Sequence, residues 1–149
     1  MYRRNEWSGV TGRQFEEEFV AEFRSVWDGS YIPFRRAMEI VRRNQPRNAV
    51  HAEGQRLLVA IAEAMGVSVN ELTLFTAAGN NALDWFHKVD AFIDFRGVTV
   101  NLDFKMRNLD SRKAFVVRPL DVENGFSFLA QSIASFIRRG MDMRGLVPV

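Results

Sequence analysis

The stretch VDAFIDFRGVTVNLDFK, residues Val89–Lys105, has the sequence pattern of a β-hairpin. Apolar and polar residues alternate on both sides of Arg96-Gly97, and such alternation predicts two strands, each with one apolar face. A two-residue turn at Arg96-Gly97 would fix the register of the two strands. A four-residue loop around the same centre would preserve that register, whereas a three-residue loop would shift it by one residue. Counting outward from this turn places Asp90 directly across from Asp103.

The two faces of the predicted hairpin differ in their chemistry. The apolar face is expected to carry Val89, Ala91, Ile93 and Phe95 from the first strand and Val98, Val100, Leu102 and Phe104 from the second. The opposite face is expected to carry Asp90, Phe92, Asp94, Thr99, Asn101, Asp103 and Lys105. The apolar face suits packing against a core, whereas the acids of the other face need a separate explanation.

The pair formed by Asp90 and Asp103 is the unusual feature of this polar face. Carboxylates on directly opposed residues have Cβ atoms about 5 Å apart and destabilise a sheet unless another charge compensates them. A divalent cation such as Mg²⁺ binds pairs of carboxylates, and the Lys105 ammonium could orient a water molecule or stabilise charge on a phosphate. The alternative is a solvated polar face on which Lys105 simply neutralises Asp103.

Periodicity predicts a mixed succession of elements around the hairpin. Helices are expected over residues 11–27, from 34 to just before Pro46, and over 57–65 with Gly66 closing the last of them. The segment after Gly66 is ambiguous, because Ser68 and Glu71 form a capping-box pattern while LTLFT favours a strand. We expect a turn followed by a strand over 72–76, and after the hairpin a strand over 114–117 and a helix over 125–139.

The chain of 149 residues is expected to form one domain of the mixed α/β class. A small central mixed β-sheet that contains the hairpin would be flanked by helices, with a helical insertion at about 34–66 before it. No apolar run approaches the roughly 20 residues that span a bilayer, and the segment MYRRNEWSG lacks the apolar core of a signal peptide. We therefore expect a cytoplasmic protein without a membrane partner, and the lack of cysteine suits a reducing compartment.

Arginine dominates the basic side chains, because 17 of the 20 Lys and Arg residues are Arg. The planar guanidinium matches phosphate with two hydrogen bonds, which favours a nucleic-acid partner. GC-rich coding would produce the same bias without any functional meaning, and the sequence leaves both explanations open. The candidate nucleic-acid contacts are Arg35, Arg36, Arg42 and Arg43 on the second helix and Arg107, Arg112 and Lys113 after the hairpin.

A further acid falls on the apolar stripe of the first predicted helix. Glu16 lies within the arc that Phe15, Phe19 and Phe23 define. A buried acid is costly unless it is paired or ligates a metal, although an acid at a helix N-terminus is also favoured by the helix dipole. Glu16 is therefore either a partner of the hairpin acids or a residue of an ordinary helix start.

Together these residues resemble the PD-(D/E)XK nuclease superfamily, which has the restriction-endonuclease-like fold. Its pattern is an acidic helix residue, an Asp at the start of a hairpin strand and D/E-x-K on the next strand, here Glu16, Asp90 and Asp103-Phe104-Lys105. The segments TGRQFEEEFV and LTLFTAAGNNALDWFHKVDAFIDFRG, followed by VTVNLDFK, are similar to those of Holliday-junction-resolvase-like members. Val89 replaces the Pro of the superfamily name, and no Q-x-x-x-Y follows Lys105.

The resemblance implies a metal-dependent active site on the hairpin. Asp90 and Asp103 would ligate Mg²⁺ (or Mn²⁺), Lys105 would orient or activate the attacking water, and Glu16 would support the metal directly or through water. The reaction would be hydrolysis of a phosphodiester that leaves a 5′-phosphate.

Two residues just before the hairpin are accessory candidates. Asp84 and His87 are spaced by three residues, and His87 precedes Asp90 by three. They could be additional ligands, or His87 could contact a phosphate. The alternative for His87 is a loop histidine that makes a local hydrogen bond.

We therefore expect a metal-dependent endonuclease that acts on nucleic acid, with DNA as the first candidate, as a possible homodimer or with a partner protein. One alternative is a non-catalytic nucleic-acid-binding or assembly module that retains the nuclease fold. Another is a structural protein whose acidic hairpin face is hydrated. The sequence lacks a glycine-rich phosphate loop, G-x-S-x-G and H-E-x-x-H, so nucleotide hydrolysis, serine esterase and zinc protease activities have no support.

Overall fold

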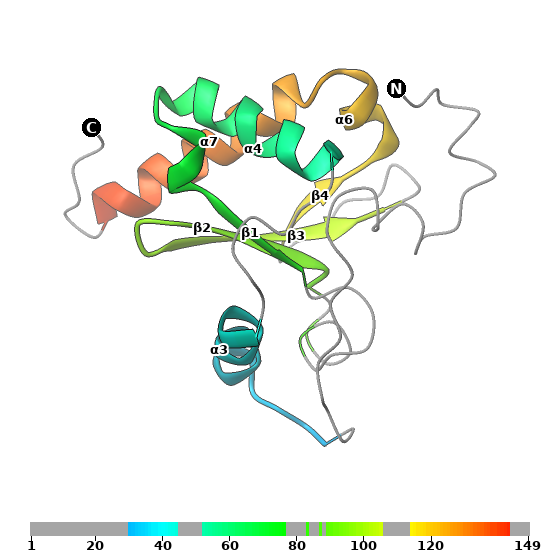
Figure 1. Ribbon diagram of the computed structural model, residues 1–149, viewed down its shortest axis with the longest axis vertical. Coiled ribbons are helices and arrows are strands. Elements are labelled where there is room, and N and C mark those ends of the chain that lie inside the picture. The colour runs from blue at the N-terminus through cyan, green and yellow to red at the C-terminus, as the bar shows by residue number, and fades with distance from the viewer. Residues whose placement is uncertain are drawn as a thin grey trace.

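A four-stranded β-sheet lies between two helical layers in the computed structural model, which describes residues 30–44, 52–76, 83, 87, 89–105 and 114–143. Figure 1 shows α4 (Ala52–Met65), α6 (Pro119–Glu123) and α7 (Ser127–Met143) on one side of the sheet and α3 (Phe34–Asn44) on the other. The predicted mixed α/β class, with a small sheet flanked by helices, is confirmed. The helix predicted over 11–27 lies outside the described residues.

The sheet has the spatial order β1 (Thr73–Thr76), β2 (Ala91–Phe95), β3 (Val98–Phe104) and β4 (Phe115–Val117). β1 and β2 are antiparallel, as are β2 and β3, whereas β3 and β4 are parallel. The sheet is therefore mixed, as predicted, and the strands expected over 72–76 and 114–117 are both present. The turn expected before β1 is the 3₁₀ helix η1 (Val69–Glu71).

The β2–β3 hairpin closes with the predicted two-residue turn. Arg96 and Gly97 have φ values of 47° and 81°, and positive φ at both central residues is the mark of the type I′ turn that suits the strand twist. Phe95 pairs with Val98 as expected. Arg96 is held in this conformation by its side chain, because Nη2 donates to Glu71 Oε1 at 2.6 Å.

The end of α4 confirms the predicted stop at Gly66. Gly66 has a φ of 70°, its amide donates to the Glu63 carbonyl, and the Val67 amide donates to the Ala62 carbonyl. These two bonds form the Schellman motif, which favours glycine at the left-handed position. The helix itself begins at Ala52, five residues earlier than the apolar stripe alone indicated.

The C-terminal region contains a helix that the sequence reasoning missed. α6 begins with Pro119 at its first turn, and Asp121 Oδ2 accepts a hydrogen bond of 2.8 Å from the Arg118 amide. Gly125 and Phe126, both with positive φ, then separate α6 from α7. α7 therefore begins at Ser127 rather than at Gly125, and it extends to Met143.

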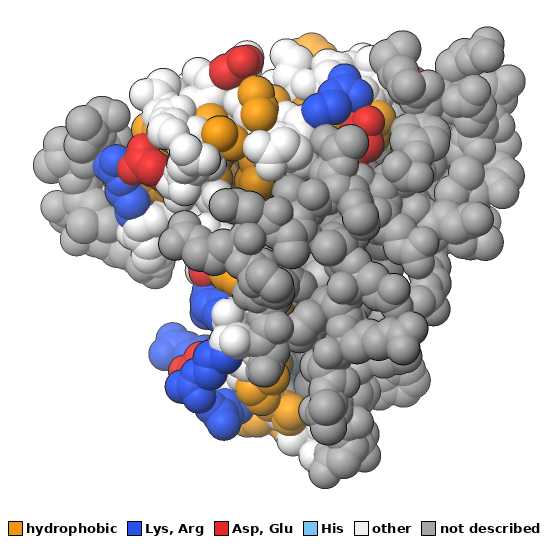
Figure 2. All heavy atoms as spheres, viewed as in Figure 1, with side chains coloured by type: hydrophobic (Ala, Val, Ile, Leu, Met, Phe, Trp, Pro, Cys, Tyr) orange, Lys and Arg blue, Asp and Glu red, His pale blue; other side chains and the backbone are white. Residues whose placement is uncertain are grey.

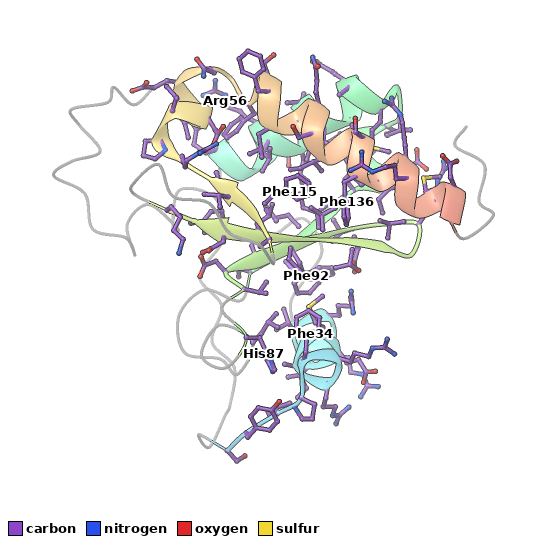
Figure 3. All side chains as sticks on the ribbon, turned by 180° about the vertical axis from the view of Figure 1, so that it is seen from behind. Phe34, Arg56, His87, Phe92, Phe115 and Phe136 are labelled. Atoms are coloured by element: carbon purple, nitrogen blue, oxygen red, sulfur yellow. The ribbon has the colours of Figure 1, made fainter. Side chains whose placement is uncertain are left out.

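The sheet separates two cores of different size. The larger core fills the space between the sheet and α4 and α7, and it includes Leu57, Ile61, Val100, Leu102, Ile133 and Ile137. The smaller core joins α3 to the opposite face and consists of Ala37, Met38, Val41, Phe75, Leu83, Val89 and Phe92. In Figure 3, Phe92 lies on the α3 side of the sheet, whereas Phe115 and Phe136 lie on the α7 side. The polar face of the hairpin is thus the face that meets α3.

Within the described residues, no helix combines the length and the apolarity that a membrane crossing requires.

Candidate functional site

The ladder between β2 and β3 becomes irregular at Asp90. The predicted register holds from the turn to the pair of Ala91 and Leu102. The Asp90 amide then also donates to the Leu102 carbonyl, at 3.0 Å, so two successive residues face one partner. This is the hydrogen-bond pattern of a β-bulge, and it means that Asp90 does not continue the ladder directly opposite Asp103.

The bulge also corrects the predicted position of Val89. Regular alternation would place Val89 on the same face as Ala91, but it packs in the smaller core with Phe75 and Phe92. A bulged residue interrupts the alternation of faces, so a residue on its far side falls on the other face. The error was in assuming a regular strand back to Val89.

The Asp90 carboxylate takes the place of a backbone acceptor at this end of the hairpin. Its Oδ2 accepts a hydrogen bond of 2.8 Å from the Phe104 amide, and only 8% of Asp90 is exposed. The bond fixes the carboxylate beside the last residues of β3.

Asp103 and Lys105 form an ion pair next to Asp90. Lys105 Nζ lies 3.1 Å from Asp103 Oδ2, and the backbone amide of Lys105 donates to the Val117 carbonyl of β4 at 3.0 Å. Asp103 is 8% exposed, like Asp90. The prediction of a hydrated acidic face is therefore wrong for these two acids, although Lys105 does neutralise Asp103 as that alternative proposed.

The arginines predicted to contact nucleic acid have different surroundings. Four of them, Arg35, Arg36, Arg42 and Arg43, lie on α3, over which blue side chains gather in the lower left of Figure 2. Arg36 pairs with Glu39 at 3.3 Å on the exposed surface. Arg35 and Arg43 are exposed and have no ion pair within the described residues.

The half-buried side chain of Arg42 is held against the hairpin by a clasp, a name used here for its bonds with Asp94 and Thr99. Arg42 Nε and Nη2 donate to the two oxygens of Asp94 at 2.7 and 2.9 Å, and Nη2 also donates to Thr99 Oγ1 at 3.0 Å. The guanidinium lies 5.0 Å from the centre of the Phe92 ring. These hydrogen bonds to Asp94 raise the pKa of Arg42. Arg42 therefore connects α3 to the hairpin.

An open groove of about 710 Å³ follows the clasp between α3 and the hairpin. Its lining residues are Phe34, Arg35, Met38, Glu39, Arg42, Asp94, Gly97, Thr99 and Asn101. Asn101 Oδ1 is buried and accepts no hydrogen bond within the described part of the chain. The groove was not foreseen from the sequence, although period-two spacing places Thr99, Asn101 and Asp103 on one face of β3.

His87 is tied to the start of α3. One ring nitrogen, Nε2, lies 2.8 Å from the Ile32 carbonyl oxygen, 55 residues away in sequence. The ring also packs against Phe34 and Tyr31, with ring centres 5.4 and 5.9 Å apart (Figure 3). This contact joins His87 to a backbone carbonyl that is distant in sequence.

The remaining predicted site residues lie outside the described residues, and they are Glu16, Asp84, Arg107, Arg112 and Lys113. Within the described residues, no group of three or more His, Cys, Asp or Glu side chains is arranged to hold a metal ion. The hairpin thus brings together two of the predicted metal ligands, Asp90 and Asp103, with the predicted catalytic Lys105.

Comparisons with known protein families, with curated proteins and with solved structures find no match for this chain.

Proposed function

We propose that the protein is a metal-dependent nuclease that hydrolyses phosphodiester bonds, with DNA as its substrate and the bulged end of the hairpin as its active site. The observation that carries the proposal is the Asp103–Lys105 ion pair beside the anchored carboxylate of Asp90. Two carboxylates and a lysine, all at one end of a hairpin, provide the groups that the PD-(D/E)XK resemblance assigns to catalysis.

The donor set suits a hard divalent cation, because Asp90 and Asp103 offer carboxylate oxygens. These two residues would hold Mg²⁺ or Mn²⁺, which supplies Lewis-acid stabilisation of the negative charge on the reacting phosphate. Their low exposure strengthens electrostatic interactions at this position. Glu16 remains the proposed additional acid.

Lys105 has a role of its own in the proposed reaction. Its ammonium donates hydrogen bonds, so it orients the attacking water and stabilises the charge that develops in the transition state. Its backbone is held by β4, and Asp103 Oδ2 lies 3.1 Å from Nζ. The backbone bond to β4 and the contact with Asp103 support this placement of the ammonium.

A cleavage assay tests the proposal. Purified protein is incubated with supercoiled and branched DNA in Mg²⁺, Mn²⁺ or EDTA, with the variants Asp103→Asn and Lys105→Met. We expect metal-dependent cutting that falls by about a hundredfold or more in both variants, the size of loss seen when a charge-stabilising group is removed. The control Asp142→Asn changes an exposed acid on α7 and should cut normally.

The second candidate function is nucleic-acid binding without cleavage. It is favoured by one observation, namely that both acids already have protein partners, the Phe104 amide for Asp90 and Lys105 for Asp103. Salt-sensitive binding of DNA with no cutting in either metal would support this candidate and overturn the nuclease. Cutting that persists in EDTA or in Asp103→Asn would overturn the proposed site.

A further inference from the structure

The groove between α3 and the hairpin lies on the face of β3 that also carries the proposed active site. Thr99 and Asn101 line it, Asp103 follows at the same period-two spacing on β3, and Lys105 comes directly after the strand. Two residues of a strand span about 7 Å, so a ligand that contacts Asn101 lies next to Asp103. The groove is therefore part of the surface that a substrate must cross.

The chemistry of the groove matches a nucleotide with an unpaired base. Phe34 lines the groove and is 37% exposed, so one aromatic ring is open to stacking. Next to it, Arg35 is an exposed cation without an ion pair in the described ranges, and it suits a backbone phosphate. The groove of about 710 Å³ has room for one nucleotide. The Phe34 ring suits its base, and the Arg35 cation suits its phosphate.

The buried Asn101 oxygen supplies a second, independent observation. An unsatisfied buried acceptor is costly in a folded protein, which indicates a missing donor. The other polar groups beside it, Arg42, Asp94 and Thr99, satisfy one another through the clasp. Amino and imino groups on the pairing edges of bases are donors of the required kind.

We infer that this groove binds an unpaired nucleotide, with its base on Phe34, a donor group of the base near Asn101 and its phosphate near Arg35. In a duplex the faces of a base are stacked and its pairing edge is occupied, so only single-stranded or locally unpaired nucleic acid presents both. The inference names the substrate class of the proposed nuclease and rests on that proposal for the adjacent cleavage. Binding itself does not depend on cleavage.

Fluorescence anisotropy in EDTA tests binding apart from catalysis. The probes are a short labelled DNA single strand, the blunt duplex of the same sequence and the matching RNA single strand. Wild type should bind one or both single strands more tightly than the duplex. Phe34→Leu, which keeps an apolar contact with His87, should weaken single-strand binding about tenfold and duplex binding less than about twofold.

Two further variants separate binding from folding. Asn101→Ala should weaken single-strand binding several-fold while the thermal midpoint stays the same or rises, since an unsatisfied acceptor is removed. Phe128→Leu is the matched control, because Phe128 is a 75% exposed aromatic residue on α7, on the other side of the sheet. It should bind as wild type does.

The outcomes separate this inference from the nuclease proposal. Equal affinity for single strand and duplex, or an equal loss of both in Phe34→Leu, overturns the groove as a site for an unpaired nucleotide. Selective binding with no metal-dependent cutting keeps the groove site and overturns the nuclease. Metal-dependent cutting without selective binding of single strands keeps the nuclease proposal and overturns the groove site. The DNA and RNA strands show which sugar the site accepts.

Discussion

At the scale of single residues, Asp90 joins a structural contact to the proposed chemistry. Its carboxylate accepts a hydrogen bond of 2.8 Å from the Phe104 amide. The bulge has removed the backbone acceptor that this amide would have in a regular ladder. A buried amide that loses its acceptor costs about 1–3 kcal/mol. The same oxygen atoms are proposed to ligate a metal, so a loss of activity alone cannot assign the role of this residue.

Comparison of Asp90→Ala with Asp90→Asn separates the two roles. Asparagine keeps an oxygen acceptor, whereas alanine leaves the Phe104 amide without one. We expect the free energy of unfolding in urea to fall by about 1–3 kcal/mol in Asp90→Ala and by less in Asp90→Asn, with cutting lost in both. Equal stability of the two variants would show that the hydrogen bond contributes little.

The clasp is the second feature that belongs to the residue scale. We expect Arg42→Met to lower the free energy of unfolding by about 1–3 kcal/mol, because charge-assisted hydrogen bonds to the half-buried Asp94 are lost. Arg43→Met, one residue further on the exposed side of α3, should change it by less than about 0.5 kcal/mol. Urea titration of both variants provides the measurement.

The pH dependence of the clasp follows from the raised pKa of Arg42. A cation whose pKa is higher in the folded than in the unfolded state stabilises the fold below its unfolded pKa, and the effect is lost only as pH rises through the folded pKa. Arginine is already protonated throughout the usual pH range. The stability difference between wild type and Arg42→Met should therefore not decline between neutral and mildly alkaline pH. A steady decline over that range would contradict this assignment.

At the scale of elements, the hairpin was predictable because local rules determine it. Alternation of apolar and polar residues, interrupted only at Phe92, and the Arg96-Gly97 turn fix the register as far as Ala91 and Leu102. The bulge was not predictable in this way, because it depends on a bond between the Asp90 side chain and the backbone of β3. The error in placing Val89 has the same origin.

Other differences among the elements have equally specific causes. α6 has only five residues, too few for helical periodicity, although Pro119 and Asp121 are typical of a helix start. Arg42 was assigned to nucleic acid because it lies on a face rich in arginine, and only the fold shows that Asp94 meets it. Arg35 and Arg43, which have no acidic partner among the described residues, keep the predicted role as a proposal.

At the scale of the whole molecule, the two helical layers differ in the size of the core that joins them to the sheet among the described residues. α4 and α7 bury a large common core on one face, whereas α3 is attached to the other face by the smaller core and the clasp. Elements with fewer buried apolar contacts open at lower free energy than the molecule as a whole. The proposed nucleotide groove therefore lies under the less firmly attached layer.

Hydrogen exchange followed by mass spectrometry tests this difference. Amides of residues 34–44 should exchange through an opening of lower free energy than those of residues 127–143. Arg42→Met should speed exchange in α3 further and leave α7 unchanged. Equal protection of the two helices would show that both layers open as one cooperative unit.

The anchoring of Asp90 has a consequence for how such a protein would diverge. A descendant that no longer cuts nucleic acid would still need an oxygen acceptor at position 90, because the Phe104 amide is buried with it. Asp103 and Lys105 neutralise each other's charge, so both could be substituted together once catalysis is no longer under selection. Retention of Asp90 would then indicate only that the hairpin is intact. Retention of both Asp103 and Lys105 would indicate that the protein still cuts nucleic acid.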